Sequence, residues 1–262
     1  MLLKIGSKGY DVQALQRLLG LDDDGIFGKN TESAVKKWQT THGLAADGIV
    51  GDKTWQSLTS SSKQVNPCVI YKPISTHITL SPKREIKYIA IHYTAGSSSK
   101  TGSALNTRRV FLNNSASADF IVDDKDIIQI NPDINNYYCW AVGDKKYSGS
   151  KGGTLYNKAT NKNTISIEIC SNLKSGTSYT MPNHEGWYFA EESISNAANL
   201  TKILMSKYKI PVSNVVRHYD ISGKCCPGII GWNNERKYTT AGSITNNRSD
   251  STAWNDFINR LR

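Results

Sequence analysis

The chain has 262 residues, of which 38% are hydrophobic and 21% charged, and its 32 lysines and arginines outnumber 22 aspartates and glutamates to give a formal net charge of +10. This composition excludes wholesale disorder, and this length accommodates one or two domains. Because no run of about 18 apolar residues occurs and the N-terminus lacks the apolar segment of a signal peptide, we expect a protein made in the cytoplasm without membrane insertion.

The first sixty residues contain an internal repeat. The stretch Asp24-Gly25-Ile26-Phe27-Gly28 returns 23 residues later as Asp47-Gly48-Ile49-Val50-Gly51. Asp-Gly pairs favour tight turns, and each copy precedes a helical pattern with a Thr near its start, Thr31 or Asn30 being the expected cap of the first. We therefore predict three short helices in a small bundle. Their apolar stripes are Val12, Leu15, Leu18 and Leu19, then Ala34, Val35 and Trp38, then Trp55 and Leu58.

This segment resembles the peptidoglycan-binding domain that is appended to many cell-wall hydrolases. The resemblance covers about residues 3–59 and rests on Gly9-x-x-Val12-x-x-Leu15-Gln16, the repeated turn motif, and Ala34-Val35-Lys36-Lys37-Trp38-Gln39 followed by Gly43-Leu44. An unrelated three-helix module is the alternative. The segment holds seven basic and seven acidic residues, so the whole excess of positive charge lies beyond it.

A polar stretch without periodicity follows the predicted bundle and ends at Asn66-Pro67, as is typical of a linker. We assign residues 1–59 to the three-helix domain, 60–83 to the linker and 84–262 to a second domain. In that second domain, strand and helix patterns alternate, which predicts an α/β fold with a mixed central sheet flanked by helices. The expected strands are 87–92, two within 118–130, 164–170 and 215–217, and the expected helices are 103–114, about 188–208, and one around Trp254 to Leu261.

Two histidines and a cysteine suit a metal site. His92 and His218 each stand where a predicted strand ends, and Cys226 follows eight residues after His218. Two imidazoles and a thiolate fill three positions of tetrahedral Zn²⁺ and leave the fourth free for water. Singly, each His is more often a packed or solvated residue. The odd count of five cysteines argues against a disulfide framework, and we expect Cys68, Cys139 and Cys170 to pack in the interior.

The second domain resembles the type 2 N-acetylmuramoyl-L-alanine amidases, which share their fold with peptidoglycan recognition proteins. The resemblance spans roughly residues 84–232 and is carried by Ile91-His92-Tyr93-Thr94-Ala95, Ser117-Ala118-x-Phe120-x-Val122-Asp123, Ser166-Ile167-Glu168-Ile169, and Arg217-His218-Tyr219-Asp220-Ile221-x-Gly223-Lys224-x-Cys226-Pro227-Gly228. It implies His92, His218 and Cys226 as zinc ligands, with Glu168 and Lys224 as catalytic residues. The reaction implied is hydrolysis of the amide between the lactyl group of N-acetylmuramic acid and L-alanine.

The chemistry agrees with these assignments. A carboxylate such as Glu168 can take a proton from water and return it to the leaving amine, and Lys224 can stabilise the developing oxyanion. The alternatives are a structural ion pair for Glu168 and a solvated loop residue for Lys224. Neighbouring side chains in an extended segment point in opposite directions, so only one of Cys225 and Cys226 should face the metal, and the spacing favours Cys226.

Some family positions differ in this chain. Asp119 and Ala141 stand where histidines are usual, and Ala118 replaces a tyrosine that some members use. These differences bear on the substrate groove and on substrate preference, and they move the expected proton transfer onto Glu168. Trp140, Asn172 and Tyr93 are candidates for binding the sugar and peptide, with core packing as the alternative role.

Together these patterns predict a phage or prophage endolysin that lyses bacterial cell walls: a zinc amidase joined to a peptidoglycan-binding bundle, with Zn²⁺ as cofactor and peptidoglycan as substrate. It would stay in the cytoplasm of the producing cell until released. The alternatives are a bacterial autolysin of the same activity and a non-catalytic peptidoglycan-recognition protein. The basic surface suits anionic wall polymers, and no nucleic-acid motif accompanies it. Host, stem-peptide preference, oligomeric state and the role of 233–252 are not indicated by these patterns.

Overall fold

The computed structural model describes residues 2–19, 21–22, 24–61, 69–95, 103–143, 152–177, 181–232, 236–238, 244–247 and 251–262. The chain divides into two compact units, Met1–Cys68 and Val69–Arg262. No helix among the described residues combines the length and the apolar character that crossing a membrane requires.

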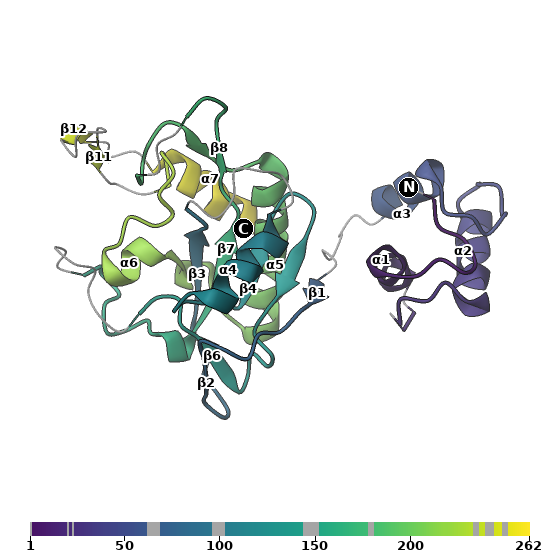
Figure 1. Cartoon of the computed structure of the whole chain (residues 1–262), viewed down its shortest axis with the longest axis horizontal. Coiled ribbons are helices and arrows are strands. Elements are labelled where there is room, and N and C mark those ends of the chain that lie inside the picture. Colours follow the sequence, from purple (N-terminus) through teal and green to yellow (C-terminus); the bar gives the residue numbers. More distant parts are fainter. Residues whose placement is uncertain are drawn as a thin grey trace. The chain divides into compact units, whose positions relative to one another are not determined.

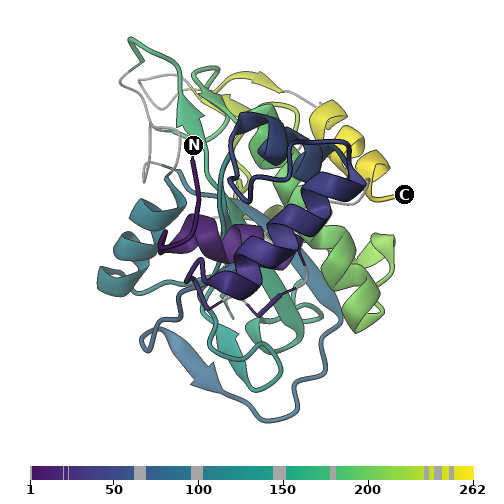
Figure 2. The same ribbon diagram turned by 90° about the vertical axis from the view of Figure 1, so that its right-hand side faces the viewer.

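The N-terminal unit contains the three predicted helices (Figures 1 and 2). They are α1 (Tyr10–Leu18), α2 (Lys29–Thr41) and α3 (Asp52–Ser61). Their apolar stripes meet in one small core, and a backbone bridge between Leu3 and Val50 ties the start of the chain to the second turn motif. The buried core residues are Leu3, Val12, Leu15, Phe27, Val35, Val50 and Leu58.

Two buried glutamines, Gln16 and Gln39, explain the repeated turn motif. The Gln16 side chain amide donates to Asp24 Oδ1 at 2.7 Å, to the Ile26 carbonyl at 3.1 Å and to Thr31 Oγ1 at 3.0 Å, and its oxygen accepts from the Gly25 amide at 2.9 Å. Gln39 makes the same four contacts 23 residues later. Its partners are Asp47 (2.9 Å), Ile49 (2.9 Å), Thr54 (3.2 Å) and Gly48 (2.9 Å).

In each copy of the repeat, the turn thus surrounds a glutamine side chain whose amide nitrogen and oxygen are both hydrogen-bonded. Thr31 is buried and bonded to Gln16, whereas the residue at the N-cap position of α2 is Gly28, so the prediction of Thr31 or Asn30 as cap was wrong. The reason is that the turn needs the Thr hydroxyl as a hydrogen-bond acceptor for the glutamine. Glycine at Gly25 and Gly48 suits the turn, because both have positive φ, 73° and 75°.

The C-terminal unit is built on a six-stranded mixed sheet in the order β1-β5-β4-β7-β3-β10. Its strands are β1 (Val69–Tyr71), β3 (Tyr88–Tyr93), β4 (Phe120–Val122), β5 (Ile127–Gln129), β7 (Thr164–Ile169) and β10 (Val215–Arg217). All neighbouring pairs are parallel except β4 with β5. The mixed α/β sheet predicted for this part of the chain is therefore confirmed.

Helices cover both faces of the sheet, since β7 and its neighbours alternate between two cores. Ile165, Ile167 and Ile169 belong to the core under α5 (Glu191–Tyr208) and α7 (Thr252–Leu261), whereas Ile121 of β4 packs on the other face with α4 (Ala104–Asn113). Figure 2 shows α4 and α7 on opposite sides of the sheet. Because side chains alternate along a strand, Ser166 and Glu168 point away from α5.

The structure corrects the predicted linker of residues 60–83. Residues 69–83 belong to the second unit: β1 pairs with β5, and β2 (Ile78–Leu80) pairs antiparallel with β6 (Tyr137–Cys139). Such short edge segments have too few residues for a detectable periodicity, which is why they read as linker.

Further short elements complete the unit. The segment 233–252 includes β11 (Arg236–Tyr238) and β12 (Ile244–Asn247), which pair antiparallel. His218 opens the short helix α6 (His218–Ser222) directly after β10. The remaining short elements are β8 (Asn172–Leu173), β9 (Trp187–Tyr188) and the 3₁₀ turns Asn161–Asn163 and Val212–Asn214.

Candidate functional site

Three neighbouring parallel strands align the polar residues of the candidate site. In the register of β3 with β7, His92 lies directly opposite Glu168. In the register of β3 with β10, Ile91 lies opposite Arg217, so His218 follows at the level of His92. The imidazole rings of His92 and His218 lie 4.7 Å apart between centroids. The carboxyl ends of adjacent parallel strands therefore present these three side chains together.

Cys226 reaches the two histidines by a short turn of chain. The α6 helix ends at Gly223, whose φ of 79° is left-handed, and the Tyr219 amide then donates to the Cys226 carbonyl at 3.0 Å. The thiol Sγ lies 3.8 Å from His92 Nδ1. One ligand atom from each of His92, His218 and Cys226 lies within 4.8 Å of the others, a spacing that allows all three to hold one ion.

The buried side chains include polar atoms that lack a partner. His92, His218 and Cys226 are 1%, 6% and 3% exposed, yet His92 Nε2 and His218 Nδ1 have no hydrogen-bond partner among the described residues. His218 Nε2, by contrast, lies 3.2 Å from the Val142 carbonyl. A carbonyl can only accept, so Nε2 carries the proton and Nδ1 offers its lone pair. Buried polar atoms without partners are costly, and a cation would satisfy them.

Electrostatics of the site also fit a dication. Burial lowers the pKa of His92 well below its usual value, and burial followed by the charge of Lys224 lowers the pKa of His218 to about 3, so both imidazoles remain neutral ligands. Burial, then Glu168, raises the pKa of the Cys226 thiol to about 12. A thiolate at that position needs a compensating positive charge, which a bound metal ion supplies. The donor set of two neutral imidazoles and one thiolate suits zinc.

Glu168 and Lys224 border the three potential ligands. Glu168 Oε1 lies 3.9 Å from His92 Nδ1, Oε2 has no hydrogen-bond partner in the described part of the chain, and 14% of the side chain is exposed. Burial raises the pKa of Glu168 to about 8 against the opposing charge of Lys224. Lys224 also acts on both histidines and on Cys226, so its ammonium is within electrostatic reach of the whole cluster.

The candidate substrate residues are placed differently from one another. Trp140 is 43% exposed and donates from Nε1 to Thr79 Oγ1 at 2.9 Å, whereas Tyr93 is buried in the main core with its ring edge-on to Trp187. Asn172, on β8, is 9% exposed. Trp140 is the most exposed of the three.

Of the cysteines that the structure describes, Cys226 alone belongs to the cluster. Cys139 and Cys170 are buried as expected, Cys225 is half-buried, and none of these three forms a disulfide. Cys68 lies outside the described residues.

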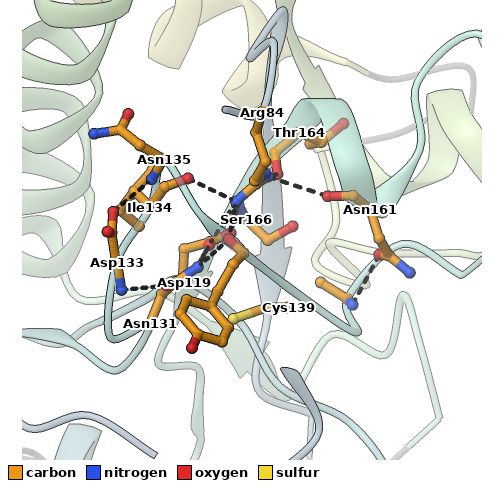
Figure 3. Close-up of polar contacts among 12 residues, drawn as sticks. Arg84, Asp119, Asn131, Asp133, Ile134, Asn135, Cys139, Asn161, Thr164 and Ser166 are labelled. Carbon is orange, nitrogen blue, oxygen red and sulfur yellow. Dashed lines mark hydrogen bonds and ion pairs between the residues drawn. The ribbon is translucent and has the colours of Figure 1, made fainter. Parts of the chain in front are cut away.

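Arg84 and Asp119 form a buried ion pair beside the site (Figure 3). No sequence pattern indicated it. The Arg84 guanidinium donates to the carbonyls of Ile134, Tyr137, Asn161, Lys162 and Thr164 and lies 3.7 Å from Asp119 Oδ1. Asp119 accepts from Asn131 Nδ2 at 2.6 Å and from the Ser166 amide at 2.7 Å. Burial raises the pKa of Asp119, with Arg84 opposing.

Asp119, one of the departures from the family pattern, therefore has a structural partner in this chain. Its carboxylate and Arg84 join segments about 80 residues apart in sequence, as the Arg84 bond to Thr164 shows. A single sequence contains no periodic signal for such a pair, because the groups that Arg84 and Asp119 contact come from separate segments of the chain.

Comparison with known proteins assigns both units. Residues 82–229 match the N-acetylmuramoyl-L-alanine amidase family, and residues 8–58 match a peptidoglycan binding domain. The N-acetylmuramoyl-L-alanine amidase CwlA of Bacillus sp is 31% identical over 158 residues, which is 57% of this chain and 54% of that protein. The N-acetylmuramoyl-L-alanine amidase XlyA of Bacillus subtilis (strain 168) is 34% identical over 143 residues, or 53% of this chain and 39% of XlyA.

A solved structure of the catalytic domain of XlyA aligns with 74% of this chain and 99% of its own length, at 26% identity and a TM-score of 0.47. This chain spans about half the length of CwlA and less of XlyA, 54% and 39%. The family match, by contrast, covers more than half of this chain and contains His92, His218 and Cys226. The chain belongs to the N-acetylmuramoyl-L-alanine amidase family.

Proposed function

We propose that this protein is a zinc-dependent peptidoglycan hydrolase that cleaves the amide between the lactyl group of N-acetylmuramic acid and L-alanine of the stem peptide. One observation carries the proposal: His92, His218 and Cys226 converge in a buried cluster with unsatisfied lone pairs, and Glu168 stands beside it. Membership of the amidase family supports the same bond as the target.

His92, His218 and Cys226 would hold the zinc ion. A zinc ion held there would supply Lewis acidity to the scissile carbonyl and to the attacking water. The low pKa of the two imidazoles keeps them neutral and able to ligate across the physiological pH range.

Glu168 is the proposed general base and acid. Its Oε2 atom has no competing hydrogen bond and can take the proton of the attacking water, while the new C–O bond forms at the lactyl carbonyl carbon. The same proton then passes to the alanine nitrogen as the C–N bond breaks, which yields a lactyl carboxylic acid and a free amine. The acid then ionises by giving its remaining proton to the amine or to solvent. Burial gives Glu168 a pKa of about 8, close to the pH at which proton transfer in both directions is efficient. Lys224 would stabilise the negative charge that develops on the carbonyl oxygen.

Substrate capture is divided between the two units in this proposal. The N-terminal unit binds peptidoglycan, and its covalent link to the amidase unit raises the local concentration of catalyst at an insoluble wall. In the amidase unit, Trp140 is the proposed platform for a sugar ring, because it is the most exposed of the three candidate residues. Asn172 and Tyr93 remain candidates for the peptide side. We place the activity at the bacterial cell wall, as in an endolysin.

Fragments released from purified walls test the reaction. We expect mass spectrometry to show stem peptides with new L-alanine amino termini and intact glycan strands without new reducing ends. New reducing ends would identify a glycosidase instead, and cuts within the stem peptide would identify a peptidase.

Metal content tests the ligand set. Wild-type protein should hold about one zinc per chain, and His218→Ala or Cys226→Ser should lose both zinc and wall lysis. Cys225→Ser is the matched control, since the neighbouring half-buried thiol is not in the cluster and its variant should keep zinc and activity. Full lysis by a zinc-free Cys226→Ser protein contradicts the proposal.

A further inference from the structure

A loop carbonyl controls which nitrogen of His218 faces the candidate metal site. The ring of His218 is buried, and Nε2 lies 3.2 Å from the carbonyl oxygen of Val142 while Nδ1 has no partner. The position of this carbonyl therefore decides whether Nδ1 or Nε2 keeps its lone pair free. Val142 itself is 1% exposed, so the contact lies in the protein interior.

Asn161 holds that loop in place. Its side chain Oδ1 accepts two successive backbone amides, from Ala141 at 3.0 Å and from Val142 at 2.8 Å. An oxygen that takes both amides fixes the peptide planes on either side of Ala141, and the second of these planes leads directly into Val142, whose carbonyl faces His218. Asn161 is 7% exposed, so these bonds face little competition from solvent.

Asn161 is in turn fixed by the buried arginine. Its main-chain carbonyl accepts from Arg84 Nη2 at 3.1 Å, and Arg84 is anchored at the same time to Thr164 at the start of β7 (Figure 3). The side chain and the main chain of Asn161 thus connect the loop at Val142 to the strand that carries Glu168.

We propose that Asn161 is a positioning residue for the metal centre: through the Val142 carbonyl it holds His218 in the Nε2–H tautomer and presents Nδ1 to the metal. The inference rests on the proposed zinc site. Partners of this kind fix the tautomer and the ring orientation of metal-binding histidines, and their loss typically weakens metal affinity by roughly 10 to 100-fold.

The tautomer is measured first, in the metal-free full-length protein. A long-range ¹H–¹⁵N NMR spectrum of the histidine side chains separates a protonated ring nitrogen from an unprotonated one. We expect wild-type His218 to show Nε2–H and Asn161→Ala to show a mixture of both tautomers. A wild-type His218 with its proton on Nδ1 overturns the proposal, whether or not Asn161→Ala folds.

Zinc affinity is measured next, by competition with a chromophoric chelator. We expect Asn161→Ala to bind zinc roughly 10 to 100-fold more weakly than wild type, and Asn161→Asp, which keeps the accepting oxygen, to recover most of the loss. Affinity of Asn161→Ala equal to that of wild type, or no recovery in a folded Asn161→Asp, overturns the proposal.

Asn163→Ala is the matched control. Asn163 lies on the same 3₁₀ turn and makes comparable bonds, to the Thr160 amide at 2.8 Å and the Lys158 carbonyl at 2.9 Å, without touching the Val142 loop. It should lower stability while leaving the His218 tautomer and zinc affinity unchanged. An equal loss of affinity in Asn163→Ala assigns Asn161 a merely structural role. Failure of the proposed amidase reaction would leave the tautomer result standing, so the two can be distinguished.

Discussion

Glu168 owes its proposed role to its immediate surroundings. Its carboxylate is mostly buried beside neutral histidines, and burial raises its pKa to about 8, so it can both accept and donate a proton near neutral pH. Glu168→Gln preserves the shape of the side chain and removes the titratable carboxyl group. We expect the variant to retain zinc and to lose roughly 10² to 10⁴-fold in turnover on soluble muropeptide.

A matched substitution at an exposed carboxylate separates this effect from a change in total charge. Glu85, whose side chain is 79% exposed, pairs only with the nearby Lys87 among the described ion pairs. Glu85→Gln should leave turnover and zinc content unchanged. Near-normal turnover in Glu168→Gln, with zinc bound, removes Glu168 from the mechanism.

The residues of the site differ in whether a single sequence can identify them. His92, His218, Cys226, Lys224 and Glu168 stand in motifs that resemble those of the amidase family, and the structure brings the two histidines and the cysteine together. Asn161 and Arg84 act through main-chain groups of distant loops. Because their partners are amides and carbonyls, which every residue has, neither leaves a motif that identifies it from sequence.

At the scale of elements, segments with a clear apolar or periodic pattern were predicted, whereas several short strands without one were missed. The stretch 188–208 and the strand 215–217 have enough periodic or apolar residues to indicate their type, and they correspond to α5 and β10. β1, β2 and β6 have three residues each and read as loop or linker. The 23-residue repeat was visible, but the glutamine inside each turn was not, since a buried glutamine in a helix looks like a surface residue in sequence.

Substitution of Gln16 or Gln39 tests whether their hydrogen bonds stabilise the repeated turns. Replacing Gln39 by Leu leaves the Gly48 amide without its acceptor and removes donors to Asp47, Ile49 and Thr54. Each buried group left unpaired costs about 1–3 kcal/mol, so the free energy of unfolding of the N-terminal unit should fall by at least that much.

Gln16→Leu should cost about the same as Gln39→Leu, because its four contacts are equivalent. Thr40→Ala, at an exposed position next to Gln39, is the control and should change the free energy by less than about 0.5 kcal/mol. The measurement is a urea titration of the full chain followed by the ¹H–¹⁵N signals of Trp38 and Trp55. A small loss in either glutamine variant would show that the turns hold without these bonds.

Acid should weaken the same turns. A backbone bond from Ile26 and then the Gln16 amide lower the pKa of Asp24, and Ile49 and then Gln39 lower that of Asp47. A carboxyl whose pKa is depressed in the folded state adds stability above its unfolded pKa, and this stability is lost as pH falls through the folded value. The N-terminal unit should therefore lose stability as pH drops below about 4. The double variant Asp24→Asn, Asp47→Asn should flatten this dependence in the same urea titration, and an unchanged slope would contradict it.

At the scale of the whole molecule, the excess of positive charge is distributed unequally along the chain. Residues 1–59 hold seven of the 32 basic and seven of the 22 acidic residues, which leaves 25 basic and 15 acidic residues in the rest of the chain. Attraction to anionic wall polymers would therefore act on the amidase part, while the balanced N-terminal unit would bind the wall by short-range contacts. Electrostatic attraction between exposed charges is screened over about 10 Å at 0.1 M salt and about 3 Å at 1 M.

Salt should accordingly separate the two kinds of binding. We expect the fragment 69–262 to release from purified walls as salt rises from about 0.1 M to about 1 M, because screening removes its long-range attraction. The full chain should keep a larger bound fraction at high salt, since the three-helix segment 1–59 has no net charge to screen. Stripping the walls of anionic polymers should abolish the salt-sensitive part and leave the rest. If the fragment bound equally at both salt concentrations, its positive charge would play no part in holding the enzyme to the wall.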